Sequence, residues 1–266
     1  MLIFGHRGAR AEAPENTVAS FVHAADHGIR HFELDLQLAA DGEIVVIHDK
    51  TLDRTTGQAG KVAEFTSAQM ASLDARHNTP PWPDPVPVPK LTEIFDACPT
   101  IQKIQLEVKS DKRDRLNVLC NRLVELIQQR GLLERVIVTS SSVWVVQQIK
   151  RLNARIQTGY VAEYRFPGPL ATALKHRCDY LCINWKICTP EIIAEAHKNG
   201  LHVSAWTVNS LPDMLRLQEQ GIDSIITDYP TNTLKFLQKH QPHLALAHMQ
   251  DGQQKRLSQA PDAKQN

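Results

Sequence analysis

Two short apolar runs of the sequence carry charged residues spaced two apart. The run HFELDL contains Glu33 and Asp35, and the run KIQLEVK contains Glu107 and Lys109. Residues two apart in a β-strand point to the same face, so the members of each pair share one side of their strand. At the carboxyl ends of parallel barrel strands, such faces look into the active-site mouth. The spacing therefore predicts that three carboxylates and a lysine converge at one place.

Three converging carboxylates need compensation for their charge, because an ionised carboxylate is costly to bury without a partner. A divalent cation would supply it, and an all-oxygen ligand set favours Mg²⁺ or Ca²⁺ over Zn²⁺. Alternatively, each acid pairs with a neighbouring arginine or lysine. The residue types alone leave both explanations open.

Two histidines follow apolar runs of the same kind. The run LIFG leads into His6 and Arg7, and the run EIVVI leads into His48. Imidazole titrates near pH 6.5, so two histidines at one barrel mouth can serve as acid and base at neutral pH. The planar donor fork of Arg7 is suited to a phosphate, and Lys109 would add a second positive charge. A single histidine at a strand end could be a purely structural hydrogen-bonding residue, but two of them with an arginine, three acids and a lysine fit that explanation poorly.

The elements that must position these side chains alternate along the chain. Strands are expected at residues 2–5, 31–36, 43–48, 103–108, 135–140, 156–161, 180–185, 202–208 and 224–228. Helices are expected at residues 16–28, 91–97, 112–130, 142–152, 168–176, 190–199, 211–220 and 231–239. Alternation of strand and helix is typical of parallel sheets with crossover helices, so we predict an α/β fold, a single-domain TIM (β/α)₈ barrel.

Nine candidate strands compete for the eight places of such a barrel. The second and third are separated only by a segment that ends in Asp41 and Gly42. Asp-Gly is a turn signal, so these strands form either a hairpin or an irregular barrel step. The proline-rich residues 77–90 are expected to be an extended loop. We assign residues 1–240 to the barrel and expect the polar, glutamine-rich residues 241–266 to be a disordered tail.

Bulk composition argues against several classes of partner. The net charge of +1 provides no overall field that would recruit nucleic acid or an acidic membrane surface. The chain starts without the apolar stretch of a secretory signal, and no run approaches the ~20 apolar residues of a membrane helix. Its 5 cysteines are odd in number and form no C-x-x-C pair, which favours buried thiols in a reducing compartment. We expect a cytoplasmic protein without stable membrane association, and the sequence does not predict its oligomeric state.

Several short motifs, in their order along the chain, resemble the glycerophosphodiester phosphodiesterase family. They are His6-Arg7-Gly8, Pro14-Glu15-Asn16-Thr17, Glu33-x-Asp35, Asp41-Gly42, His48-Asp49, Arg54-Thr55-Thr56-Gly57 with Gly60, Leu73-Asp74-Ala75, Glu107-x-Lys109, Trp206-Thr207-Val208-Asn209 and Thr227-Asp228-Tyr229-Pro230. The matches extend from residue 5 to residue 230, and the paired histidines with the E-x-D motif are specific.

The resemblance implies a TIM barrel of the PLC-like phosphodiesterase type that needs one divalent cation, Mg²⁺ or Ca²⁺. It implies metal ligands at Glu33, Asp35 and Glu107 and an acid–base pair at His6 and His48. It also implies phosphate or substrate contacts at Arg7, Lys109 and Trp206. The implied reaction is hydrolysis of a small glycerophosphodiester to sn-glycerol 3-phosphate and an alcohol.

Three further residues have a structural explanation beside a functional one. Asn16 is expected first to organise its loop and only second to belong to the site. Asp228 could cap the following helix or support the site as a nearby carboxylate. Trp206 could instead be a buried aromatic residue of a strand.

Two other functions are considered. A lysophospholipase D acting on lysolipids would need an apolar groove, for which the sequence offers only the loop around Trp82. A non-catalytic barrel that binds phosphate or lipid would be expected to have lost a histidine or a ligand acid, and this chain has all of them.

Overall fold

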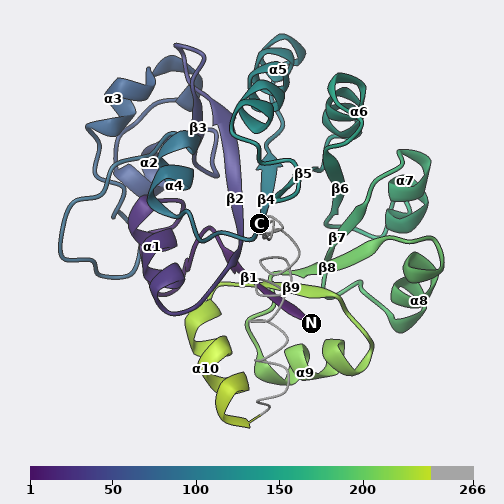
Figure 1. The fold of residues 1–266 in the computed structure, drawn as a ribbon. Helices are drawn as coiled ribbons and strands as arrows, with labels where there is room; N and C mark the ends of the chain where they lie inside the picture. The colour runs from purple at the N-terminus through teal and green to yellow at the C-terminus, as the bar shows by residue number, and fades with distance from the viewer. Residues whose placement is uncertain (241–266) are drawn as a thin grey trace, which may run out of the picture.

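Eight parallel strands close into a barrel in the computed structural model, which describes residues 1–240 (Figure 1). The strands are β1 (Leu2–His6), β2 (His31–Leu38), β4 (Lys103–Val108), β5 (Val136–Ser140), β6 (Gln157–Ala162), β7 (Tyr180–Asn184), β8 (His202–Trp206) and β9 (Ser224–Thr227). Each pairs in parallel with its neighbour in this order, and β1 pairs with both β2 and β9. The predicted single-domain TIM barrel is confirmed. The predicted tail, residues 241–266, lies outside the described residues.

The ninth strand is a hairpin partner outside the barrel. Strand β3 (Ile44–Val46) pairs antiparallel with the end of β2, with Leu36 opposite Val46. The connecting turn contains Gly42 with a φ of 81°, a left-handed conformation that glycine adopts without steric cost. Of the two arrangements that the sequence left open, the hairpin is the correct one.

Helices surround the barrel, as the alternation predicted (Figure 1). The main helices are α1 (Val18–Asp26), α4 (Leu91–Ala97), α5 (Arg113–Gln129), α6 (Val143–Leu152), α7 (Pro169–Lys175), α8 (Pro190–Lys198), α9 (Leu211–Glu219) and α10 (Pro230–His240). Helix α5 shows why they pack there, because its buried residues recur at the helical period. These are Leu116, Leu119, Cys120, Leu123, Val124 and Ile127.

Three short helical turns between β3 and α4 were not predicted. They are α2 (Asp53–Thr56), η1 (Val62–Glu64) and α3 (Ser67–Ala71). None is long enough to show an amphipathic repeat, and local hydrogen bonds define them instead. In α3, Thr66 accepts a hydrogen bond from the backbone of Gln69, whose side chain accepts one from the backbone of Thr66.

The barrel strands are buried on both faces, as expected when helices cover a parallel sheet. Every residue of β5 and β9 is buried. All five cysteines are buried free thiols, as the sequence indicated. Within residues 1–240, no helix combines the length and apolar character needed to span a bilayer.

Candidate active site

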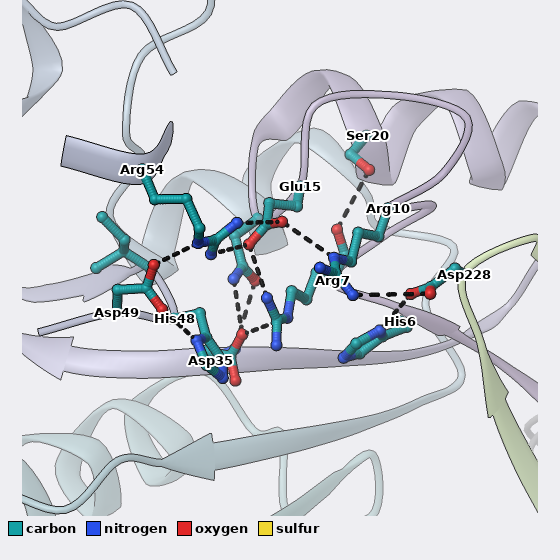
Figure 2. A network of polar contacts seen from close by, with 12 residues as sticks. His6, Arg7, Arg10, Glu15, Ser20, Asp35, His48, Asp49, Arg54 and Asp228 are labelled. Atoms are coloured by element: carbon teal, nitrogen blue, oxygen red, sulfur yellow. Dashed lines mark hydrogen bonds and ion pairs between the residues drawn. The ribbon is translucent and has the colours of Figure 1, made fainter. Parts of the chain in front are cut away.

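A tight turn after β1 directs the first group of polar residues. Arg7 and Gly8 both have positive φ, 50° and 89°. A Cβ on Gly8 would lie 2.5 Å from the Ser20 hydroxyl, so only glycine fits there. That hydroxyl accepts a hydrogen bond from the Ala9 amide at 2.8 Å and donates one to the Arg7 carbonyl at 3.2 Å (Figure 2). Helix α1 thus fixes a strained turn that places the Arg7 side chain.

Three carboxylates meet at the carboxyl ends of β2 and β4. Asp35 pairs with Glu107 in the sheet register, and Glu33 precedes Asp35 by two residues on the same face. One carboxylate oxygen from each of the three residues lies within 4.8 Å of the other two. Glu33 and Asp35 are almost fully buried, at 4% and 1% exposure. The convergence predicted from the two-residue spacing is present in the structure.

Two cations neutralise part of this cluster. The Lys109 ammonium lies 2.8 Å from both Asp35 and Glu107, and Arg7 Nε lies 2.9 Å from Asp35. Burial alone would raise the pKa of Asp35, but Arg7 and Lys109 hold it far below its usual range. The alternative of pairing with basic residues is therefore realised for Asp35 and Glu107.

Glu33 remains without a cationic partner of this kind. Its Oε1 has no hydrogen-bond partner among the described residues, and its Oε2 accepts a 3.3 Å bond from the Arg7 amide and lies 3.8 Å from His6 Nε2. Burial, reinforced by the charges of Asp35 and Glu107, raises the pKa of Glu33 well above its usual range. A buried carboxylate oxygen without a partner, beside two more carboxylates, fits a hard divalent cation held by oxygen ligands.

Each of the two histidines is held by a carboxylate through Nδ1. His6 Nδ1 lies 2.5 Å from Asp228 Oδ1, and His48 Nδ1 lies 2.6 Å from Asp49 Oδ1. Each carboxylate accepts a hydrogen bond from the Nδ1–H group, which leaves Nε2 as the nitrogen that can exchange a proton. Burial lowers the pKa of both imidazoles, although the hydrogen bond to Asp228 opposes this shift at His6. Asp228 therefore acts as a carboxylate that orients His6.

Glu15 connects the surroundings of Arg7 with those of His48 (Figure 2). It accepts hydrogen bonds from Arg7 at 2.8 Å, from Arg10 at 3.1 Å and from both terminal nitrogens of Arg54 at 2.9 and 2.7 Å. Arg54 also bonds Asp49, the partner of His48. Burial alone would raise the pKa of Glu15, but Arg54 and Arg7 lower it to about 2.

The sequence prediction did not assign the positioning roles of Glu15, Asp49 and Arg54. All three belong to short motifs that were noted, but the contact between Glu15 and Arg54 joins residues 39 apart, and no local pattern encodes it. Asn16 both organises its loop and contacts the site, because its amide donates to Asp35 at 2.8 Å and its backbone N–H donates to the Arg7 carbonyl. That agrees with the two roles expected of it.

The predicted site residues lie together in one cleft of about 530 Å³. Its lining includes His6, Arg7, Glu33, His48, Glu107, Lys109 and Trp206, while Asp35 is buried next to them. The Trp206 indole donates a hydrogen bond to the Cys182 carbonyl at 3.1 Å, which fixes the ring at the end of β8. Trp82 lines a different surface hollow, so its loop supplies no apolar groove at this cleft.

Comparisons with known proteins agree with this geometry. Residues 6–232 match the model of the glycerophosphoryl diester phosphodiesterase family. A glycerophosphodiester phosphodiesterase of Caldanaerobacter subterraneus subsp. tengcongensis is 31% identical over 90% of this chain and 98% of its own length.

Solved structures show the same fold. One is a protein of Silicibacter pomeroyi assigned to the glycerophosphoryl diester phosphodiesterases, with a TM-score of 0.83 and 27% identity over 89% of this chain and 93% of its own. Another, with a TM-score of 0.76 and 24% identity over 87% of this chain and 94% of its own, is an Oleispira antarctica phosphodiesterase in complex with the product sn-glycerol-3-phosphate. The family match, the relative and the barrel agree, and the chain belongs to the glycerophosphoryl diester phosphodiesterase family.

Proposed function

We propose that the protein hydrolyses glycerophosphodiesters to sn-glycerol 3-phosphate and an alcohol, with a divalent cation held by Glu33, Asp35 and Glu107. The observation that carries this proposal is the juxtaposition in one cleft of two carboxylate-held imidazoles, three carboxylates and two cationic side chains. We place the catalytic unit in residues 1–240. Membership of the family and the product bound by the Oleispira antarctica phosphodiesterase support the choice of substrate.

Arg7 and Lys109 would bind the phosphate and offset the charge that develops on its oxygens. Their positions are fixed by Asp35, which contacts both. When bound, Mg²⁺ or Ca²⁺ would polarise the phosphate oxygens and hold the glycerol hydroxyls. Trp206 lines the cleft where the substrate would lie.

Proton transfer falls to the Nε2 atoms of His6 and His48. One imidazole accepts the proton of the attacking oxygen, which belongs to water or to the 2-hydroxyl of the glycerol. The other delivers a proton to the oxygen of the departing alcohol as its bond to phosphorus breaks. Attack by the 2-hydroxyl would give a cyclic phosphate, which water then opens to sn-glycerol 3-phosphate.

The test is release of glycerol 3-phosphate from glycerophosphocholine by the purified protein and by its His6→Ala and His48→Ala variants. We expect each substitution to lower kcat by roughly 10²- to 10⁴-fold, the usual contribution of a positioned acid or base. A His176→Ala variant, altered outside the cleft, serves as the control. Full turnover in both cleft variants would show that the histidine assignment is wrong. Phosphate binding without turnover by the wild-type protein would favour the non-catalytic barrel.

A further inference from the structure

The far side of the catalytic cleft carries aromatic side chains that the proposed chemistry does not use. The loop of residues 163–168 joins β6 to α7, and its Glu163, Tyr164 and Phe166 line the cleft. In the cyclic order of the barrel, β6 lies four strands from β1 in either direction, so this loop faces the turn that carries His6 and Arg7.

Two residues of this loop expose far more apolar surface than is usual for their type. Phe166 is 89% exposed and Tyr164 is 68% exposed. The other large hydrophobic residues exposed within residues 1–240 are Val118 and Tyr229, which are 42% and 43% exposed. Exposed aromatic side chains at the rim of a cleft mark a binding surface.

The loop carries two charged side chains, Glu163 and Arg165, and of these Glu163 lines the cleft whereas Arg165 is exposed outside its lining. Three cations also line the cleft, and each is paired with a carboxylate: Arg7 and Lys109 with Asp35, and Arg10 with Glu15. Interaction with the carboxylate of the neighbouring Glu163 raises the pKa of the Tyr164 hydroxyl. Deeper in the cleft, the buried Tyr160 and the fixed ring of Trp206 add two further aromatic surfaces.

We propose that residues 163–168, together with Tyr160 and Trp206, form a subsite for the departing headgroup that selects a quaternary ammonium such as choline. Aromatic faces attract such cations, and a nearby carboxylate adds charge complementarity. An acyl chain would gain nothing from the Glu163 carboxylate and would have to desolvate it. This inference rests on the proposed function, because the headgroup can reach this loop only if the phosphate of the substrate is bound at Arg7 and Lys109.

The experiment compares kcat/KM for four substrates that separate headgroup from acyl chain. They are the choline and glycerol diesters of glycerol 3-phosphate, each with and without a short acyl chain on the glycerol. The variants are Tyr164→Ala, Phe166→Ala and Glu163→Gln, all at exposed positions, with Phe166→Trp to restore an aromatic face. Val118→Ala, on α5, is the matched control for removing exposed apolar surface.

We expect the wild-type protein to prefer the choline diesters. Each loop substitution should lower kcat/KM for choline diesters by roughly three- to tenfold more than for glycerol diesters, chiefly through KM, and Phe166→Trp should retain the preference. Equal losses for both headgroups would overturn the inference. Losses in kcat/KM that are larger for the acylated substrates than for the substrates without an acyl chain would also overturn it, and would assign the loop to the binding of lysolipids. If the wild-type protein hydrolyses none of the four, the proposed function itself fails, and the inference fails with it.

Discussion

At the scale of single residues, the cleft contains two histidines that are each hydrogen-bonded to a carboxylate. His6 and His48 come from unrelated parts of the chain, yet each has a carboxylate at Nδ1 within 2.6 Å. Such a carboxylate fixes both the ring orientation and the tautomer, so that Nε2 is the nitrogen presented to the substrate. Both imidazoles therefore present Nε2 for proton exchange, which suits a reaction that needs one acid and one base.

The substitution Asp228→Asn directly tests the role of the carboxylate bonded to His6. The carboxamide that replaces the carboxylate would no longer favour the Nδ1–H tautomer of His6, so we expect kcat to fall roughly 10- to 100-fold. KM should change little, because Asp228 acts on His6 and not on the substrate. Steady-state kinetics on a glycerophosphodiester provide the measurement, with the exposed Asp96→Asn as the control. An unchanged kcat would show that His6 needs no carboxylate partner.

The sequence was sufficient to predict some of these residues and insufficient for others. The two-residue spacing in β2 and β4 places Glu33, Asp35 and Glu107 on one face, because strand periodicity is a local property. The pairing of His6 with Asp228 joins residues 222 apart in sequence and depends on closure of the barrel. No local periodicity encodes such a contact, so the role of Asp228 stayed open until the fold was known.

At the scale of elements, the segment between β1 and α1 ties the site together. Glu15 lies at its centre and contacts Arg7, Arg10 and Arg54, which lead to Asp35, Asp228 and Asp49. These contacts connect the turn after β1 with the short helix α2, an element too short for sequence periodicity to reveal. The unpredicted short helix α2 is therefore part of the support of the site.

Replacement of Glu15 by Gln should weaken both the fold and the catalysis. It removes the carboxylate from three guanidinium groups, and breaking a buried ion pair on one side costs on the order of 3 kcal/mol in the free energy of unfolding. Urea denaturation at pH 7 measures this loss, and kcat should fall because Arg7 and Asp49 lose their common anchor. The exposed Glu195→Gln is the control, for which we expect less than about 0.5 kcal/mol. Equal stability of the two variants would contradict the role given to Glu15.

At the scale of the whole molecule, the two ends of the barrel have different tasks. The catalytic groups gather at the carboxyl ends of the strands, whereas the opposite end is closed by structural contacts. His202, the first residue of β8, bonds the Ser224 hydroxyl at 2.8 Å and packs against the Tyr180 ring at a centroid distance of 4.2 Å. Burial lowers the pKa of His202 to about 4, although Asp223 opposes the shift.

This depressed pKa makes the stability of the barrel depend on pH. The unfolded chain binds a proton at His202 near pH 6.5 and the folded protein only near pH 4, so the free energy of unfolding falls as pH drops through that interval. The contribution is complete above about pH 6.5 and is lost below about pH 4. Urea denaturation from pH 7 to pH 4.5 should show a flatter pH dependence for His202→Asn than for wild type. The exposed His27→Asn should follow wild type, and identical slopes for His202→Asn and wild type would contradict the assignment.

The central claim is that the three carboxylates hold a cation on which phosphodiester hydrolysis depends. The most direct test is glycerol 3-phosphate release from glycerophosphocholine and glycerophosphoglycerol by EDTA-treated protein, before and after addition of Mg²⁺ or Ca²⁺. We predict that EDTA abolishes release, that one of these ions restores it, and that Glu33→Gln weakens the restoration. Undiminished release in EDTA would contradict the claim that Glu33, Asp35 and Glu107 hold a cation needed for the reaction.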